Sequence, residues 1–167
     1  MTQTRPPAEI AASEDRLALL ADLFATATRP DVRADRDASA AALRGFLEQA
    51  WCAETAYVPE LWRAETPSTG QCAVTTALLV AMFGGHAVRA HGADGGDEVE
   101  HWWAHTPHHG PLDLTADQFR IPPAWDRITT ASLRDLLAHP QTGRRVDLLS
   151  ARLADAMRAA APAALEA

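Results

Sequence analysis

Three residues of this sequence have the types and the order of a thiol catalytic site: Cys72, His101 and Asp113. A cysteine attacks a carbonyl carbon as the thiolate, while a histidine takes the thiol proton and a carboxylate orients the imidazole ring. Cysteine, then histidine, then aspartate is the chain order of many thiol enzymes that handle acyl groups. The three residues therefore predict acyl chemistry, which is hydrolysis of an amide, ester or thioester, or transfer of its acyl group to an amine.

The segment around Cys72 predicts a buried helix that presents the thiol at its N-terminus. Thr69 can cap a helix that runs to about Phe83, where Gly84-Gly85 ends it, and Cys72 is then its third residue. A helix N-terminus lowers the pKa of a thiol, because the positive end of the macrodipole favours the thiolate. The free backbone N–H groups of the first turn can also hold a developing oxyanion.

A hairpin is predicted to bring His101 and Asp113 together. A three-residue loop at 106–108 sets His105 opposite His109, and the same register sets His101 opposite Asp113. Directly opposed side chains of an antiparallel pair point to the same face and lie about 5 Å apart. A one-residue slip in this register would move one of them to the other face.

Each of the three residues also has a structural interpretation. An apolar helix that contains one cysteine is usually a core helix. His101 lies beside two tryptophans and could be a packed histidine, and Asp113 could cap the turn that follows it. Because the three occur together in this order and with these placements, we favour catalysis over three unrelated roles.

Further candidates surround this triad. Gln71 and the indole N–H of Trp62 are candidates for an oxyanion contact, and Trp102 is a candidate for a substrate contact. Trp102 alternates with His101 and should face the other side of the sheet. Cys52 follows the end of a helix without a partner pattern, and we interpret it as a buried structural thiol.

The dense histidines between 101 and 109 suggest a metal site, but their spacing argues against one. On a strand, His101 and His105 are about 13 Å apart at roughly 3.3 Å per residue, which is too far to share an ion. The sequence holds no His-Glu-x-x-His and no paired Cys-x-x-Cys motif. His108 and His109 are expected to be turn residues in solvent. We expect no metal and no cofactor.

Length and composition narrow the class of protein. A chain of 167 residues has the typical length of one domain. A domain of this size buries enough surface to be stable without disulfide bonds or structural metal ions. The net charge of −7 argues against nucleic acid as a partner, and all 15 basic residues are arginine, so a lysine nucleophile is excluded. We expect a cytoplasmic protein, because two cysteines make no disulfide framework and neither a membrane span nor a signal peptide is recognisable.

The pattern of elements predicts an α+β fold, with helices first, a small antiparallel sheet next and helices again. Thr115-Ala-Asp-Gln118 matches a capping box that should start a short helix or turn. We divide the chain into an N-terminal extension at 1–38, a catalytic-type domain at 39–160 and a tail at 161–167. The expected segments are disorder at 1–12, a helix from Ser13, a loop at 29–37, a helix from Ser39 to Trp51, an irregular segment at 52–70, strands at 86–90, 99–105 and 111–115, a loop at 121–126, and helices at 129–138 and 146–160.

Short motifs also occur in a fixed order along roughly residues 43–150: Trp51-Cys-Ala-Glu-Thr55, Trp62, Pro67, Gly70-Gln-Cys-Ala-Val-Thr75, Phe83-Gly-Gly85, His101-Trp-Trp103 and Asp113-Leu-Thr-x-x-Gln-Phe119. Through them the chain resembles the YunG-like family of small bacterial proteins. The resemblance implies a papain-like, transglutaminase-like core, in which Cys72 is the nucleophile, His101 the base and Asp113 the orienter. The chain departs from that pattern at Thr66, where papain-type enzymes carry an oxyanion glutamine, and at the first tryptophan after His101, where a tyrosine is expected. It also carries an N-terminal extension of about 40 residues.

Two classes of function follow. The first is a thiol hydrolase or acyltransferase that acts on a small-molecule or peptide acyl substrate. That substrate could be bound to a carrier, and the enzyme could form a homo-oligomer. The second is a non-catalytic binding or accessory protein with a vestigial triad. A redox-sensing thiol is a third interpretation, in which Cys52 is the only available resolving cysteine.

Overall fold

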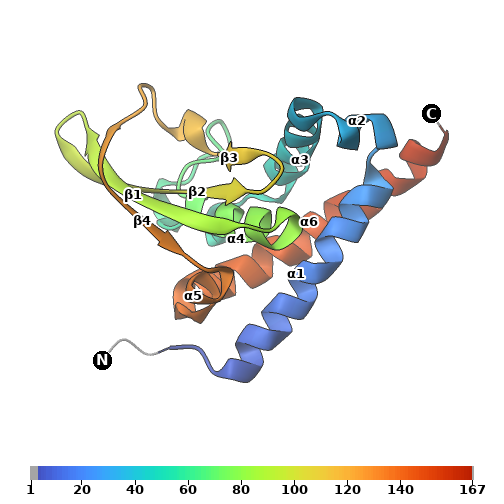
Figure 1. Cartoon of the computed structure of the whole chain (residues 1–167), viewed down its shortest axis with the longest axis horizontal. Helices are drawn as coiled ribbons and strands as arrows, with labels where there is room; N and C mark the ends of the chain where they lie inside the picture. The colour runs from blue at the N-terminus through green and yellow to red at the C-terminus, as the bar shows by residue number, and fades with distance from the viewer. Residues whose placement is uncertain (1–3, 167) are drawn as a thin grey trace.

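The chain forms a helical layer that lies against a small sheet. The computed structural model describes residues 4–166, with side-chain surroundings for residues 4–161 (Figure 1). In chain order the elements are α1 (Pro7–Ala27), α2 (Pro30–Ala34), α3 (Arg36–Ala50), the 3-10 turns η1 (Ala53–Thr55) and η2 (Pro59–Leu61), α4 (Cys72–Phe83), β1 (His86–Asp94), β2 (Asp97–Thr106), β3 (Gly110–Leu112), η3 (Ala116–Gln118), β4 (Ala124–Ala131), α5 (Leu133–Ala138) and α6 (Pro140–Glu166).

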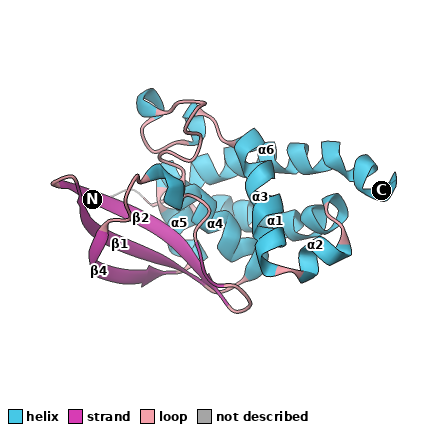
Figure 2. Ribbon diagram, turned by 90° about the horizontal axis from the view of Figure 1, so that it is seen from above, coloured by secondary structure: helices cyan, strands magenta, loops and turns pink. Residues whose placement is uncertain are grey.

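The sheet is antiparallel throughout, with the strand order β3-β2-β1-β4. The helices gather on one side of it (Figure 2). Alternation along the strands turns Ala87, Ala104 and Leu112 toward that side, and all three belong to the buried apolar core. The predicted α+β class is confirmed.

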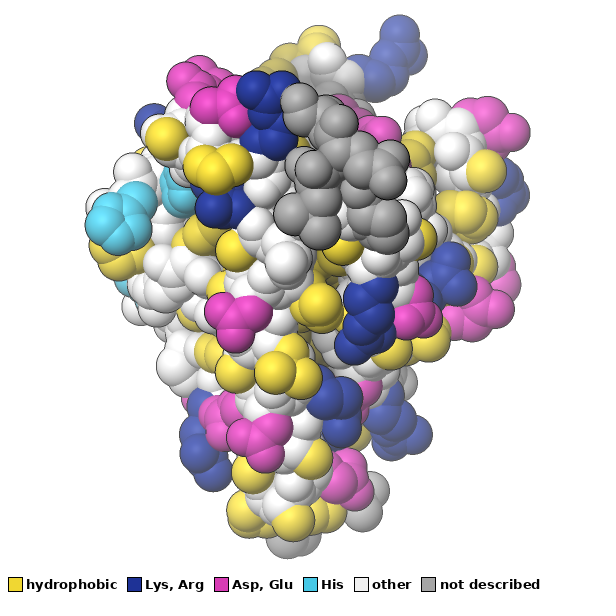
Figure 3. Space-filling model, turned by 90° about the vertical axis from the view of Figure 1, so that its right-hand side faces the viewer, with side chains coloured by type: hydrophobic (Ala, Val, Ile, Leu, Met, Phe, Trp, Pro, Cys, Tyr) yellow, Lys and Arg dark blue, Asp and Glu magenta, His cyan; other side chains and the backbone are white. Residues whose placement is uncertain are grey.

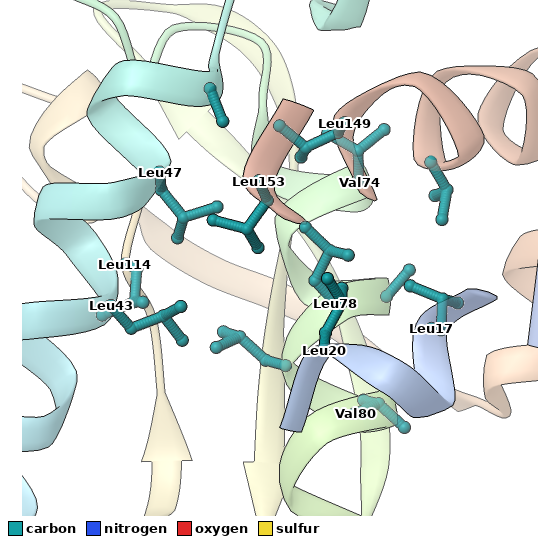
Figure 4. Packing of buried hydrophobic residues seen from close by; sticks show 14 of the residues in the cluster. Leu17, Leu20, Leu43, Leu47, Val74, Leu78, Val80, Leu114, Leu149 and Leu153 are labelled. Carbon is teal, nitrogen blue, oxygen red and sulfur yellow. The ribbon is translucent and has the colours of Figure 1, made fainter. Parts of the chain in front are cut away.

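Helix α4 occupies the centre of the helical layer. All residues from Val74 to Val80 are buried, so the helix is apolar around its whole circumference and must be enclosed by other elements. Leucines of α1, α3 and α6 converge on it (Figure 4). This packing fixes the N-terminus of α4, where Cys72 lies.

The N-terminal segment is more ordered than predicted. Helix α1 begins at Pro7, within the stretch predicted as disordered; residues 1–3 of that stretch lie outside the described residues. Proline favours the first turn of a helix because its missing N–H has no partner to lose there. The expected loop at 29–37 instead contains α2 and the start of α3, which is capped by Asp35 rather than Ser39.

The region after residue 120 also differs from the prediction. Residues 124–131 form β4, an edge strand paired with β1, where we predicted a loop followed by a helix from 129. Ile128, Thr129 and Thr130 are β-branched, and pairing with β1 outweighs the weak helical pattern. Helix α5 then begins after Ser132, whose side chain caps it, and α6 extends the predicted helix at both ends.

The hairpin of β2 and β3 has a different register from the predicted one. Thr106 pairs with Gly110 and His105 with Pro111, so the loop is 107–109 rather than 106–108. Each residue of β2 therefore pairs two positions further along β3 than predicted. A shift of two preserves the face of every side chain, because the strand period is two residues.

The surface carries both signs of charge. Acidic and basic side chains are interspersed over the face shown in Figure 3. Within the described residues, no helix is long and apolar enough to cross a membrane.

Candidate active site

His101 is buried, with only 2% of its surface exposed, and both of its ring nitrogens have hydrogen-bond partners. Its Nε2 lies 2.6 Å from Oδ2 of Asp113. The other carboxylate oxygen, Oδ1, accepts from the backbone N–H of Thr115 at 2.9 Å and from its hydroxyl at 3.0 Å. Asp113 therefore caps the next turn and holds His101 at the same time, so both interpretations of this residue describe real contacts.

Gln118 is a second partner of the ring that the sequence analysis missed. Its Nε2 donates to the carbonyl of Thr115 at 3.0 Å and lies 3.1 Å from Nδ1 of His101. The contact with a carbonyl identifies the nitrogen end of the amide, so Gln118 is the donor toward Nδ1. The predicted capping box is wrong in this respect, since neither Thr115 nor Gln118 caps η3 with its side chain.

Aromatic rings enclose the imidazole. His101 stacks on Trp125 with ring centroids 5.7 Å apart, meets Phe119 edge-on at 5.0 Å and lies 6.0 Å from Trp103. The motif Asp-Leu-Thr-x-x-Gln-Phe thus supplies three of the groups around the ring, namely a carboxylate, an amide and a phenyl group. Leu114, in the same motif, is buried in the core and fixes the segment from inside.

A mostly aromatic cavity of about 350 Å³ opens beside the ring. His101, Asp113 and the three aromatic side chains line it together with prolines of the segment before β4. Trp125 pairs with Gly92 after a register shift between β1 and β4, in which β4 carries one extra residue between Trp125 and Arg127. A Cβ at Gly92 would lie 2.5 Å from the carbonyl oxygen of Ala124, so this approach of the two strands requires glycine.

Cys72 is the first residue of α4 rather than the third. The N-cap is Gln71 in place of the expected Thr69, because Gly70 turns the chain with φ +72° immediately before it. Gly70 also accepts a backbone hydrogen bond from Tyr57 at 2.8 Å, which ties the preceding irregular segment to the start of the helix. No side chain caps this helix, so its first N–H groups are not covered by a capping side chain.

Electrostatics connects Cys72 to His101. Burial by itself lowers the pKa of His101, but hydrogen bonding and charge interactions with Asp113 and Cys72 raise it to about 9. A thiol affects the ring in this way only from close range. The structure therefore brings together Cys72, His101 and Asp113, the three residues selected from the sequence.

The other candidates have their own partners. Gln71 is fully buried and its Nε2 donates to the carbonyl of Cys52 at 3.0 Å, whereas its Oε1 has no hydrogen-bond partner among the described residues. The indole N–H of Trp62 donates to Pro67 at 3.1 Å. The indole N–H of Trp102 donates to Glu100 at 2.8 Å, on the opposite face of the sheet from His101.

The second cysteine lies in a different environment. Cys52 is half-buried, and the hydroxyl of Thr55 donates to its sulfur at 3.8 Å. Cys52 and Cys72 are both free thiols. Among the described residues, no three His, Cys, Asp or Glu side chains are placed to hold one metal ion.

A model of one protein family, described as YunG protein, matches residues 39–158. No curated protein and no solved structure matches the chain. The matched range contains α3 from its fourth residue, the whole of α4 and every residue of the site, and it excludes α1 and α2.

Proposed function

The chain belongs to the YunG protein family, and we propose that it is a cysteine-dependent acyl-transfer enzyme with a papain-like, transglutaminase-like arrangement of Cys72, His101 and Asp113. The observation that carries the proposal is the coupling of a buried, carboxylate-bound histidine to a thiol at a helix N-terminus. A histidine that served packing alone would need neither the thiol nor the adjoining cavity.

The hydrogen bonds assign a role to each ring nitrogen. Asp113 occupies Nε2, so Nδ1 is the nitrogen that exchanges a proton with the thiol. With a pKa of about 9 the ring is protonated at neutral pH, and an imidazolium beside Cys72 stabilises the thiolate. Asp113 in turn stabilises the imidazolium and fixes the orientation of the ring.

The reaction then runs in two balanced steps. The thiolate of Cys72 adds to the carbonyl carbon of an amide, ester or thioester, and the backbone N–H groups of the first turn of α4 receive the oxyanion. The intermediate collapses, the bond to the leaving group breaks and His101 gives that group its proton. Water or an amine then attacks the acyl-enzyme and gives its proton to His101, and the bond to sulfur breaks to release the acyl product and restore the Cys72 thiolate beside the imidazolium.

Gln118 adjusts this proton transfer. Its amide donates to Nδ1 and so stabilises the neutral ring, whereas Asp113 and Cys72 stabilise the charged ring. The amide must give way when Nδ1 carries a proton. Gln118 thus keeps the ring oriented in the neutral state and gives up the Nδ1 contact when the imidazolium forms.

The substrate we propose is a small molecule or peptide, because the two cavities beside the site measure only about 350 and 370 Å³. The two free thiols suit a reducing compartment, and we place the enzyme in the cytoplasm on this ground.

The test is to trap the acyl-enzyme. The protein would be incubated with a panel of p-nitrophenyl esters and N-acetylcysteamine thioesters, and its intact mass measured. We expect an acyl adduct in the wild type and in Cys52→Ser, and none in Cys72→Ala. A full adduct in folded Cys72→Ala would refute the assignment of the nucleophile. If no donor acylates the wild type and the Cys72 thiol reacts like a free one, the chain is a binding protein with a vestigial triad.

A further inference from the structure

A second cavity adjoins the site on the side of the sheet that faces the helices. It measures about 370 Å³, and Ala73, the neighbour of Cys72, is one of its walls. The other walls come from Tyr57, β1, β2, the end of β4 and the α5–α6 region, and Arg89 and Arg145 are the two arginines among them. We propose that this cavity binds a carboxylate group of the substrate, with Arg145 as its main partner. The proposal rests on the proposed function in taking the ligand to be the substrate.

Arg145 is a half-buried cation without a carboxylate. Among residues 4–161, no Asp or Glu oxygen lies within 4.0 Å of its guanidinium. It is held by weak contacts, stacking over Tyr57 at 5.5 Å and donating to the carbonyl of Gln141 at 3.3 Å and the hydroxyl of Thr142 at 3.4 Å. A charge removed from water is costly unless an opposite charge compensates it. The guanidinium is therefore positioned but not neutralised by the chain.

Arg89 adds an unused donor to the same cavity. One of its terminal nitrogens pairs with Glu100, and its guanidinium lies over Trp102, so its charge is already compensated. Its Nε is buried and has no hydrogen-bond partner in the described part of the chain. A buried donor without a partner costs on the order of 1–3 kcal/mol, and an acceptor brought by a ligand would remove that cost.

The remaining charges favour a singly charged ligand. Glu100 is paired with Arg89, and Asp135 at the exposed rim accepts from both the backbone N–H and the hydroxyl of Ser132. Neither neutralises Arg145. One uncompensated cation with a carboxylate at the rim complements a carboxylate better than a doubly charged phosphate.

The cavity is also within electrostatic reach of the reactive thiol. Burial lowers the pKa of Arg145, and charge interactions with Cys72 and Tyr57 act in the opposite direction. The basic cavity has Ala73, the neighbour of Cys72 in the chain, in its wall, and the aromatic cavity has His101 in its wall. A substrate that spans both would have an apolar part on one side of the scissile bond and a carboxylate on the other.

Two alkylating probes that differ only in charge test the proposal. Bromoacetyl-glycine carries a carboxylate, and bromoacetyl-glycinamide is its neutral counterpart. Rates of Cys72 alkylation by each would be measured at low ionic strength in a Cys52→Ser background. The variants are Arg145→Gln and, as a matched control, Arg144→Gln, which makes the same change of charge at the exposed neighbouring position that does not line the cavity.

We expect the ratio of the charged to the neutral rate to fall about tenfold in Arg145→Gln and to stay near the parent value in Arg144→Gln. Because Arg145 also interacts with Cys72 through its charge, the neutral probe measures any change in the thiol itself, and the ratio isolates the effect of the probe's carboxylate. Circular dichroism would show that both variants are folded. An equal ratio in all three proteins, or an equal fall in both variants, would overturn the carboxylate site. Slow reaction of the parent with the neutral probe instead counts against the activated thiol, so the two proposals fail separately.

Discussion

Two buried polar clusters of this molecule are built from similar parts and differ in what they leave free. In one, the guanidinium of Arg5 reaches Ser13, the carbonyl of Leu137 and the carboxylate of Asp147, joining α1 to α5 and α6. Arg5 is 6% exposed and Ser13 is fully buried. In the other cluster, His101 binds Asp113 and Gln118. Both clusters place a charged pair within the protein.

The two clusters differ in whether a nucleophile and an open cavity lie beside the buried charges. The Arg5 cluster contains no nucleophile, and Gly143 brings the backbone of α6 against the guanidinium, with no room even for a Cβ. The His101 cluster opens onto a cavity and has a thiol beside it. Burial and ion pairing alone therefore indicate stability. A reactive group and adjoining space are what point to chemistry.

The largest expected effect is on the His101 cluster. Asp113→Ala removes the group that orients the ring and stabilises the imidazolium, so we expect turnover of any acyl donor found to fall by about 10²–10⁴-fold. The matched control is Asp117→Ala, which removes an exposed carboxylate of η3 that pairs with Arg44. Steady-state rates of the two variants separate the roles. Equal losses in both would show that Asp113 acts only by holding the segment.

The Arg5 cluster should show the opposite pattern. Arg5→Met leaves Asp147 with less compensation in a partly buried position, and we expect a loss of about 3 kcal/mol in the free energy of unfolding. Arg16→Met is the control, because Arg16 contacts the same carboxylate at 2.6 Å but is half exposed, and it should cost about 1 kcal/mol or less. Urea titration gives both values. Alkylation of Cys72 should be unchanged in either variant, and a slower reaction would mean that the two clusters are coupled.

The pH dependence of stability distinguishes the clusters further. The pKa of His101 is raised to about 9 in the folded protein, above its ordinary value of 6.5. Its protonation therefore stabilises the fold fully below about pH 6.5, and this contribution is lost as the pH rises through about 9. Asp113→Ala should reduce the stability difference between pH 6 and pH 9.5 by at least about 1 kcal/mol, whereas Arg5→Met should leave that difference unchanged. Denaturation at the two pH values measures both, and an unaltered difference in Asp113→Ala would contradict the assignment.

The smallest expected effect concerns Gln118. Gln118→Met keeps the approximate volume but loses the donor toward Nδ1, so the neutral ring loses a hydrogen bond of about 1 kcal/mol and the pKa of His101 rises further. A titration followed by ring ¹⁵N chemical shifts would measure the change. A lower pKa in this variant would show that Gln118 supports the charged ring instead.

The placement of the three candidate residues could be predicted from the sequence because small errors in helix start and strand register do not move them to another face or another end of an element. Cys72 was placed at a helix N-terminus, although Gly70 moved the cap from Thr69 to Gln71. His101 and Asp113 were placed on one face through a hairpin register that was wrong by two, and a shift of two keeps the face. The family model covers the same region, and the resemblance deduced from its motifs is confirmed.

The parts that the sequence did not predict depend on contacts that no local pattern shows. Strand β4 is mostly exposed, so it carries little apolar alternation, and its pairing with β1 is long-range. Arg5 lies in a stretch that looks disordered by composition, and its partner Asp147 is 142 positions away. Gln118 fits a capping box in sequence and turns to His101 only in the folded chain. Its place in the Asp-Leu-Thr-x-x-Gln-Phe motif was the one available signal.

An activated Cys72–His101 pair is tested most directly by the rate at which iodoacetamide alkylates Cys72 at pH 6, in a Cys52→Ser background, with and without His101→Ala. An ordinary thiol is almost fully protonated at this pH and reacts slowly. We predict that Cys72 reacts at least about tenfold faster than N-acetylcysteine and that His101→Ala, shown to be folded by circular dichroism, removes the difference. A rate equal to that of N-acetylcysteine and unchanged by His101→Ala would contradict an activated Cys72–His101 pair.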